Sequence, residues 1–231
     1  MESKRRYGAP KVYHKLLKHG IKVSLKLVQR LMNEMGLFSI VVKKWRATKN
    51  VAIDNRNFPN LLGQDFAAIS PNQKWAADMT YIYTKRDGWC YLATIQDLYS
   101  RKIIAHQLSR VMTAELVTNV LKQACETRQL STGLILHTDL GSQYRSQMFE
   151  NELETNGIKH SYSKRGCPYD NAILESFHAS LKKEEVYQNS YSTFEVAHQA
   201  LFSYIEGFYN RRRIHGGINY KTPNEMELIA V

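Results

Sequence analysis

Three carboxylates in this sequence occupy positions at which acidic side chains are unusual. Asp78 lies inside an alternating stretch rich in Thr and Tyr, which predicts a strand, and aspartate is depleted in strands. Asp139 follows the apolar run LILHT, where another strand is expected to end, and Glu175 lies in the first turn or so of a predicted helix. Because α/β proteins place ligands at the carboxyl ends of strands, we expect the three side chains to converge if their elements are neighbours.

Clustered carboxylates of this kind indicate a metal site that acts on phosphate esters. Carboxylates in a partly buried cluster repel one another, and divalent cations relieve this repulsion. Magnesium binds a few carboxylates together with water and phosphate oxygens, and two such ions can activate a nucleophile and stabilise a leaving oxygen. Each residue alone also fits an ordinary role: Asp78 as a buried hydrogen-bonding group, Asp139 as a turn former and Glu175 as an exposed helical residue. The three together favour phosphoryl transfer.

The positive charge of the chain is concentrated in its first fifth. The formal net charge is +11, and all of it arises from residues 1–50, which hold thirteen Lys and Arg and two acidic residues. The rest of the chain holds nineteen residues of each kind. A basic segment joined to a neutral one is typical of a nucleic-acid-binding head on a working domain. A solvated basic face that maintains solubility is the alternative.

Composition excludes several classes of protein. Hydrophobic residues make up 43% of the chain, enough for a core, so a disordered chain is excluded. The apolar runs are too short to cross a bilayer, and the N-terminus carries no apolar signal segment, so we expect no membrane partner. Three widely spaced cysteines argue against a disulfide framework or a cysteine metal clip. We therefore expect a cytoplasmic protein, associated with the nucleoid if its source is a prokaryote.

Residues 1–38 are expected to form a small, basic helix-turn-helix. Gly20 separates two predicted helices, Gly36 ends the second, and Ser24 is its expected N-cap. The polar face of the second helix carries side chains that suit phosphates and base edges, namely Lys26, Gln29 and Arg30. A helical hairpin with a basic exterior remains the alternative.

The rest of the chain is predicted to be a linker followed by an α/β domain. Residues 39–72 combine a basic stretch with Asn and Pro residues, which is typical of a linker. Beyond it, strands are predicted at 75–84, 89–96, 102–108, 133–138 and 158–162, and helices at 114–128, 147–156, 171–187 and 194–209. A three-strand meander followed by alternating helices and strands favours a mixed sheet with helices on its faces.

Several blocks of the sequence resemble one known family. WAADMTYI, HTDLGSQY and KRGCPYDNAILESFHASLKKE are similar to the catalytic blocks of insertion-sequence transposases of the IS-three family, whose core is of the retroviral-integrase type. YGAPKVYHKLLKHGIKVSLKLVQRLMNEMGL and YIEGFYNRRRIHGGINYKTPNEME are similar to its helix-turn-helix and closing blocks. The 35 residues between Asp139 and Glu175 match the spacing of the family's Asp-Asp-Glu signature.

The resemblance implies an α/β fold of the RNase H-like type, with a mixed five-stranded sheet flanked by helices. The catalytic core would occupy residues 73–190, and a C-terminal helical extension would occupy residues 191–231. Asp78, Asp139 and Glu175 would be both the catalytic and the metal-binding residues, with two Mg²⁺ or Mn²⁺ ions. Water, and then a DNA 3′-hydroxyl, would attack a phosphodiester in line, without a covalent protein–DNA intermediate.

The resemblance extends to the helix that carries Glu175. Lys182 lies two helical turns further along the same face and matches a basic position that is expected to contact DNA near the scissile phosphate. Asn171 and His178 share this face at i−4 and i+3. Either side chain fits a role in orienting a ligand or phosphate, and both also fit capping and packing.

Other matches concern residues further from the helix. His137 shares the strand face of Asp139 and either supports the site or packs, and Asp97 is an acid that is typical of the family, with a structural or metal-adjacent role. A short basic run near the C-terminus suits phosphates, with a solvated run as the alternative: Arg211, Arg212 and Arg213. Leu140 departs from the polar or basic residue that many relatives carry.

The resemblance also predicts partners. Transposon ends and target DNA are expected to bind, and paired ends imply at least a dimer on DNA. In this family the active enzyme is typically a fusion, so the product of an upstream reading frame is an expected partner. A non-catalytic DNA-binding regulator that needs such a fusion for activity is the main alternative, and an RNase H-type hydrolase is the closest enzymatic one.

Two other classes of recombinase fit less well. A retroviral integrase would need an N-terminal zinc module with two histidines and two cysteines, and His14 and His19 have no nearby cysteine pair. A tyrosine recombinase would carry a histidine followed three residues later by arginine, and none of the eight histidines has this arrangement.

Overall fold

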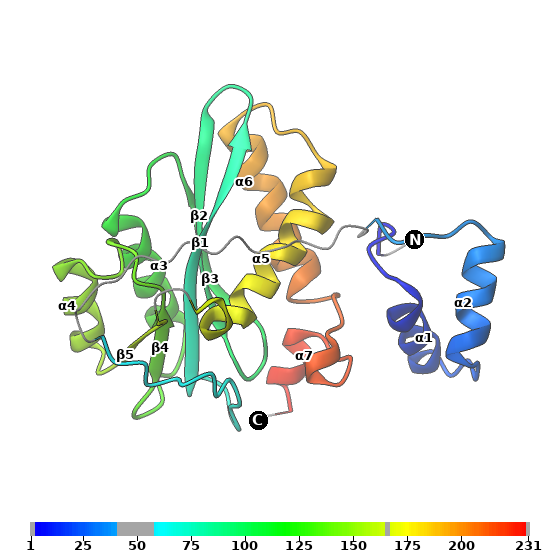
Figure 1. Cartoon of the computed structure of the whole chain (residues 1–231), viewed down its shortest axis with the longest axis horizontal. Helices are drawn as coiled ribbons and strands as arrows, with labels where there is room; N and C mark the ends of the chain where they lie inside the picture. Colours follow the sequence, from blue (N-terminus) through cyan, green and yellow to red (C-terminus); the bar gives the residue numbers. More distant parts are fainter. Residues whose placement is uncertain (1–2, 41–57, 165–166, 230–231) are drawn as a thin grey trace.

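The N-terminal part of the protein is a helical hairpin. The computed structural model describes residues 3–40, 58–164 and 167–229, so the basic stretch expected in the linker at 43–49 lies outside the described residues. Helices α1 (Ala9–Lys18) and α2 (Leu25–Glu34) stand to one side of the core (Figure 1). The Ser24 hydroxyl accepts a hydrogen bond from the backbone N–H of Leu27, which confirms Ser24 as the N-cap of α2.

The core is built on one mixed five-stranded sheet, as predicted. Its strands are β1 (Lys74–Thr84), β2 (Gly88–Asp97), β3 (Ile103–Ser109), β4 (Ile135–Thr138) and β5 (Lys159–Tyr162), in the order β3-β2-β1-β4-β5. The first three strands form an antiparallel meander, and β4 and β5 continue the sheet in parallel with β1. Gly88 has a φ of 74° at the first turn, as the Asp-Gly signal indicates.

Helices cover both faces of this sheet (Figure 1). They are α3 (Ala114–Thr127), α4 (Gln147–Thr155), α5 (Ala172–Glu184) and α6 (Phe194–Phe202). Alternation along β1 sends Trp75 and Ala77 into an apolar cluster with α3 and α4, and sends Ala76 and Ile82 into a second cluster with α5 and α6. The face used by each polar residue of β1 is therefore fixed by the burial of its neighbours.

β4 pairs with only the first part of β1. The pairing joins Lys74–Ala76 to Ile135–His137, so the expected strand at 133–138 begins two residues late. Beyond Ala76, no described strand pairs with this edge of β1 until Thr84 bridges to Tyr191. The edge of β1 is consequently open over most of its length, including the position of Asp78.

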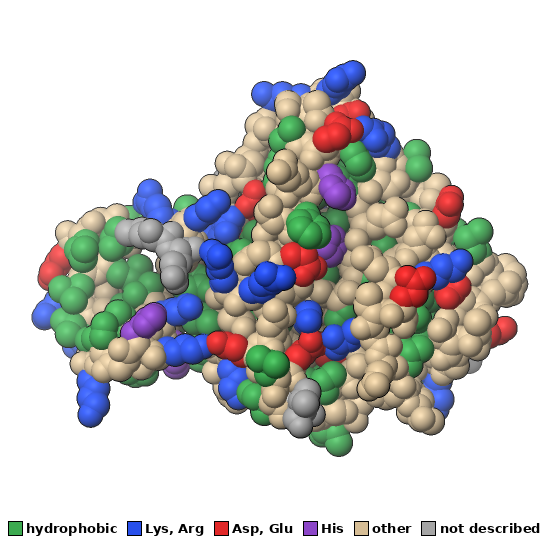
Figure 2. All heavy atoms as spheres, turned by 180° about the vertical axis from the view of Figure 1, so that it is seen from behind, with side chains coloured by type: hydrophobic (Ala, Val, Ile, Leu, Met, Phe, Trp, Pro, Cys, Tyr) green, Lys and Arg blue, Asp and Glu red, His purple; other side chains and the backbone are tan. Residues whose placement is uncertain are grey.

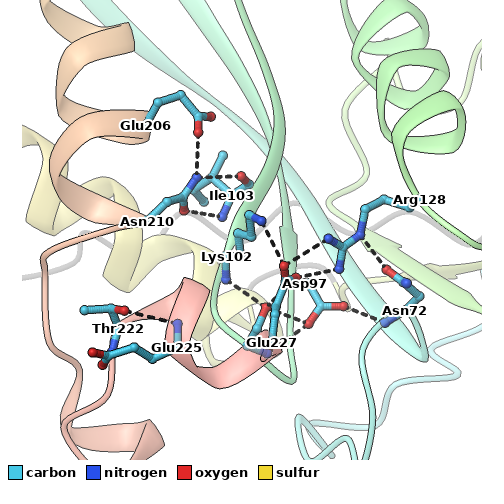
Figure 3. A network of polar contacts seen from close by, with 11 residues as sticks. Asn72, Asp97, Lys102, Ile103, Arg128, Glu206, Asn210, Thr222, Glu225 and Glu227 are labelled. Atoms are coloured by element: carbon cyan, nitrogen blue, oxygen red, sulfur yellow. Dashed lines mark hydrogen bonds and ion pairs between the residues drawn. The ribbon is translucent and has the colours of Figure 1, made fainter. Parts of the chain in front are cut away.

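The C-terminal segment runs back along the core through short helical elements. The C-terminal segment, residues 191–229, contains a π-helix, η3 (Ser203–Tyr209), that extends α6, and then η4 (Gly216–Ile218) and α7 (Pro223–Glu227). Two short helical elements precede it, η1 (Pro168–Asn171) before α5 and η2 (Val186–Gln188) after α5. The carboxylate of Glu227 holds α7 against the core, because it accepts hydrogen bonds from Lys102 at 2.8 Å and from Arg128 at 2.5 Å (Figure 3). No helix of the described residues is long and apolar enough to span a bilayer.

The helical hairpin is attached to α5 and to the C-terminal segment. The guanidinium of Arg6 donates to the carboxylate of Glu185 at 2.6 Å and lies 4.4 Å from the ring centroid of Phe208. The His14 ring stacks on Tyr220 with a centroid separation of 3.4 Å. Seen from behind, Lys and Arg side chains gather where the hairpin meets the core (Figure 2).

Candidate active site

The elements that carry the three carboxylates are neighbours in space. β1, which carries Asp78, pairs with β4, and Asp139 directly follows β4. α5 carries Glu175 in its first turn and packs against β1. The side chain of Asp78 is 19% exposed, whereas Asp139 and Glu175 are exposed. The sequence predicted that the three carboxylates would converge if their elements were neighbours, and these elements are neighbours.

The carboxylate of Asp78 is held by α5 and by its own strand. Its Oδ1 accepts a hydrogen bond from the backbone N–H of Met79 at 2.7 Å, and its Oδ2 accepts one from Asn171 Nδ2 at 3.2 Å. The Nδ1 of His178 lies 3.5 Å from the same Oδ2. Asn171 and His178 are both buried, so their positions are set by packing. The face of α5 that includes Glu175 therefore orients Asp78.

Asp139 is oriented by the turn that follows it. Its Oδ1 accepts a hydrogen bond from the backbone N–H of Gly141 at 2.8 Å. A Cβ atom placed on Gly141 would lie 2.9 Å from this oxygen, closer than real Cβ atoms approach. The residue after Leu140 must therefore be glycine for this carboxylate to keep its position.

Asp139, Glu175 and Tyr144 all lie within reach of the charge of Asp78. Loss of solvent and the negative charge of Asp78 raise the pKa of Asp139, although part of this side chain stays exposed. Loss of solvent and Asp78 likewise raise the pKa of Glu175, and the nearby His178 opposes the change. Burial, followed by the charges of Asp78 and Asp139, raises the pKa of the Tyr144 phenol well above its usual range. Negative charge is thus concentrated around Asp78.

The donor set suits a hard divalent cation. Among residues 3–40, 58–164 and 167–229, no three His, Cys, Asp or Glu side chains lie close enough together to hold a metal ion in this conformation. Mg²⁺, however, is usually bound by one or two carboxylates and completes its octahedron with water and phosphate oxygens. A cation beside Asp78 and Asp139 would also remove the repulsion that raises the pKa of Asp139. The residues present therefore fit such an ion.

An aromatic groove of about 820 Å³ lies beside Lys182, between the β1–β2 hairpin and the end of α5. Its lining includes Tyr81, Tyr83, Lys85, Trp89 and Lys182. The first two rings and that of Trp89 are more than half exposed. Loss of solvent lowers the pKa of Lys182 while the charge of Asp78 raises it, so the end of the groove at Lys182 lies within reach of the charge of Asp78. Exposed rings beside lysines are the components of surfaces that stack unpaired bases.

His137 and Asp97 have structural roles. Both ring nitrogens of His137 are engaged, at 2.9 Å from the hydroxyl of Ser161 and 2.9 Å from that of Ser163. Burial lowers the pKa of His137 to about 4, so the ring is neutral at pH 7. The carboxylate of Asp97 is buried and accepts the backbone N–H of Asn72 at 2.7 Å (Figure 3). Of the roles considered for these residues, packing and turn formation fit the structure.

The basic run near the C-terminus divides into surface and interior residues. Arg211 and Arg212 are exposed, as are the α2 residues Lys26, Gln29 and Arg30. Arg213, by contrast, is buried and forms an ion pair with Glu184, with Nη2 to Oε1 at 2.9 Å and Nε to Oε2 at 3.0 Å. The expectation that Arg213 contacts phosphate is therefore corrected, because its charge is already satisfied inside the protein.

Thr94 and Tyr144 are the residues of this region that sequence reasoning undervalued. Thr94 lies opposite Asp78 in the β1–β2 register, and its hydroxyl lies 3.2 Å from His178 Nε2. The signal for Thr94 was available, because a three-residue loop at 85–87 fixes this register. Tyr144 belongs to the block HTDLGSQY, and its side chain is 1% exposed and lies within reach of the charges of Asp78 and Asp139.

Comparison with protein families matches almost the whole chain. Residues 69–168 and 156–223 match families described as integrase core domain, and residues 1–45 match a family described as HTH-like domain. The mixed sheet and the helical hairpin described above correspond to these two parts.

Individual relatives agree with the family matches. The chain is 41% identical to the transposase for insertion sequence element IS904 of Lactococcus lactis subsp. lactis (strain IL1403), over 98% of this chain and 89% of that one. It is 38% identical to transposase InsF for insertion sequence IS3A of Escherichia coli (strain K12), over 97% and 78%. Among solved structures, the HTLV-2 integrase catalytic core domain in complex with magnesium matches with a TM-score of 0.53 at 18% identity, over 70% of this chain and 99% of that one, and this likeness concerns the fold alone.

Proposed function

Because the chain belongs to the IS3 family of insertion-sequence transposases, we propose that it cuts and joins insertion-sequence DNA at a divalent-metal site formed by Asp78, Asp139 and Glu175. The observation that carries this assignment is electrostatic. Loss of solvent and then the charge of Asp78 raise the pKa of both Asp139 and Glu175, and the pairing of β1 with β4 and the packing of α5 on β1 bring the three residues together from separate elements. Mutual repulsion of this kind is what a bound cation relieves.

The remaining residues of the site have assisting roles in this proposal. Asn171 and His178 hold the Asp78 carboxylate, and the backbone N–H of Gly141 holds that of Asp139. A divalent cation held by the three carboxylates, Mg²⁺ or Mn²⁺ and two ions in our proposal, supplies the Lewis acidity for in-line phosphoryl transfer. Lys182 contacts a phosphate of the DNA next to the bond that is cut, since its amine lies within the field of Asp78.

The proposed path of the DNA uses surface residues at both ends of the chain. Residues 1–38 form the DNA-binding part, 39–72 the linker, 73–190 the catalytic core and 191–231 the C-terminal extension. Exposed side chains make the contacts, from α2 (Lys26, Gln29 and Arg30) and from the C-terminal segment (Arg211 and Arg212). The aromatic groove accommodates bases beside the cleaved strand.

Two partners besides DNA belong to this proposal. Joining two transposon ends requires at least two copies of the chain on DNA. The product of an upstream reading frame, present as a fusion, would help to recognise the ends. Family membership favours a transposase over a non-catalytic regulator, and the difference between the two is accessible to experiment.

The proposal is tested by incubating the chain with labelled insertion-sequence-end DNA and Mg²⁺. Wild type is compared with Asp139→Asn, which keeps the shape of the side chain and removes its charge. Asp65→Asn is the matched control, because Asp65 is exposed and lies outside the site. We expect metal-dependent cleavage and joining by wild type and by the control, and loss of both with Asp139→Asn.

Two other outcomes are informative. Equal activity of wild type and Asp139→Asn contradicts the assignment of the carboxylates. If all three proteins are inactive, the same comparison is repeated with the upstream product fused to the chain. DNA binding without cleavage by that fusion would favour the regulator.

A further inference from the structure

A basic cavity of about 400 Å³ lies where the helical hairpin, the sheet and the C-terminal segment meet. The basic cavity is lined by Lys11, Arg101, Arg213 and His215, together with Ser176 and Ser180 of α5 and the backbone of Gly216 and Gly217. Among the described residues, the only carboxylate that forms an ion pair with any of these basic groups is Glu184, which pairs with Arg213. Two cations, Lys11 and Arg101, therefore face the cavity without an ion-pair partner in the described part of the chain.

Both unpaired cations are held there at an energetic cost. Lys11 comes from α1, and burial together with the charge of Arg213 lowers its pKa to about 8. Arg101 has a φ of 63°, a left-handed conformation that side-chain-bearing residues rarely adopt. Loss of solvent lowers the pKa of Arg101. The charge of Asp97 attracts the Arg101 guanidinium, but the oxygens of Asp97 already accept hydrogen bonds from the backbone N–H groups of Asn72 and Ser100. Strain and desolvation at one position are typical of functional sites.

His215 lies in the positive electrostatic field of the basic cavity. Its Nδ1 lies 3.1 Å from Nη1 of Arg213. Burial, and then the charges of Arg213, Lys11 and Arg101, hold the pKa of His215 well below its usual range. The cavity therefore repels a further positive charge, and an anion would be attracted.

Neutral donors complete a site for an oxyanion. Ser176 and Ser180 lie one helical turn apart on α5, and the Ser180 hydroxyl oxygen accepts a hydrogen bond from Arg213, which leaves its proton to donate. Gly216 and Gly217 bring backbone close without side chains. Arg, Lys, hydroxyl and backbone N–H groups are the usual partners of phosphate oxygens. A volume of about 400 Å³ lies within the range of small-ligand pockets.

We propose that the basic cavity binds a phosphate group through Lys11 and Arg101. The phosphate belongs either to the DNA backbone or to a free phosphate compound. Ser176 directly follows Glu175, so the bound phosphate lies along the helix that carries the third carboxylate. Because Lys11 belongs to the helical hairpin and Arg101 to the turn between β2 and β3, the phosphate joins these two parts. This proposal does not rest on the carboxylate site.

The first test uses pyrophosphate as the probe and EDTA to remove metal. Calorimetry and melting of the full chain compare wild type with Lys11→Gln/Arg101→Gln and with a control that loses the same charge at exposed positions, Arg86→Gln/Lys159→Gln. We expect wild type and control to bind equally, and each lost charge-assisted hydrogen bond to weaken binding by about tenfold. The melting temperature without pyrophosphate shows whether each variant is folded, and the single substitutions replace the double one if it is not.

The second test identifies the source of the phosphate. Duplex DNA binding is measured by fluorescence anisotropy over a range of salt concentrations. If the phosphate belongs to DNA, pyrophosphate competes with DNA and the Lys11→Gln/Arg101→Gln variant loses about one unit of salt slope for each phosphate contact. If pyrophosphate binds without competing, a free phosphate compound is the ligand. The proposal is overturned if wild type and the double variant bind pyrophosphate with the same affinity and their DNA binding has the same salt slope. This conclusion holds whatever effect Asp139→Asn has on cleavage.

Discussion

Replacement of Arg213 separates a role in folding from a role in DNA binding. Its guanidinium contacts both carboxylate oxygens of Glu184, at 2.9 and 3.0 Å, and the Ser180 hydroxyl at 2.9 Å. The only other side-chain group bonded to that carboxylate in the described residues is the hydroxyl of Tyr204, at 2.8 Å. Arg213→Met keeps most of the apolar stem and removes the charge. Glu184, whose side chain is 4% exposed, would then be a buried anion without an ion-pair partner among the described residues.

The expected loss is large for one substitution. Removal of one partner from a buried ion pair costs about 3–5 kcal/mol, since the remaining charge is uncompensated. In a protein of this size each kcal/mol lowers the melting temperature by about 2–4 °C, so we expect a fall on the order of 10 °C. Glu184→Gln/Arg213→Met removes both charges and should recover most of the loss, because the cost arises from the unpaired ion.

Thermal unfolding followed by circular dichroism measures the effect, and Arg211→Met is the matched control. Arg211 is exposed and belongs to the same run of three arginines. Its replacement should change stability by less than about 0.5 kcal/mol and weaken DNA binding. An Arg213→Met protein that melts close to wild type but binds DNA poorly would refute the assignment of Arg213 to the interior.

Three further predictions concern the site and its surroundings. Lys182→Gln should weaken binding of end DNA about tenfold without lowering the melting temperature, as measured by anisotropy and melting, because it removes one charge-assisted phosphate contact. Gly141→Ala should lower metal-dependent cleavage in a folded protein, since the added Cβ would lie 2.9 Å from Asp139 Oδ1 and would force this exposed carboxylate to shift. Burial lowers the pKa of His137 from 6.5 to about 4, so the unfolded chain takes up this proton first and stability falls as the pH falls through that window. Between pH 7 and pH 5, the free energy of unfolding measured with urea should fall by about 2 kcal/mol less for His137→Asn than for wild type.

Local patterns predicted the elements that position the site. The helix predicted at 114–128 has one apolar stripe and therefore one way to pack, and the residues of this stripe are all buried in α3, namely Leu116, Val117, Val120, Leu121 and Ala124. The alternation in β1 likewise placed Asp78 on the same face as Ala76 and Ile82, towards α5. Signals of this kind depend on neighbours within a few residues, which a sequence displays directly.

Contacts between distant residues were beyond such patterns. Nothing near Arg213 distinguishes it from Arg211, and the difference arises from Glu184, 29 residues earlier in the chain. His137 is similar, because its two serine partners lie on and just after β5, 24 and 26 residues later. The basic cavity takes Lys11 and Arg101 from parts of the chain that only the fold brings together. Burial of a charged group depends on its partner, so its position cannot be read from its own surroundings in the sequence.

The short β4 explains why the carboxylates and the aromatic groove occur side by side. If β4 continued to pair with β1 beyond Ala76, its backbone would occupy the edge along which Lys182 and the loop before Tyr191 now face the exposed rings of Tyr81 and Tyr83. An unpaired edge invites pairing with other chains, and here the bridge from Thr84 to Tyr191 covers its far end. The register of β4 on β1, followed two residues further, brings Asp139 level with Asp78, and the charge of Asp78 adds to the loss of solvent that raises the pKa of Asp139. A longer β4 would therefore give a more regular sheet, and it would close the groove.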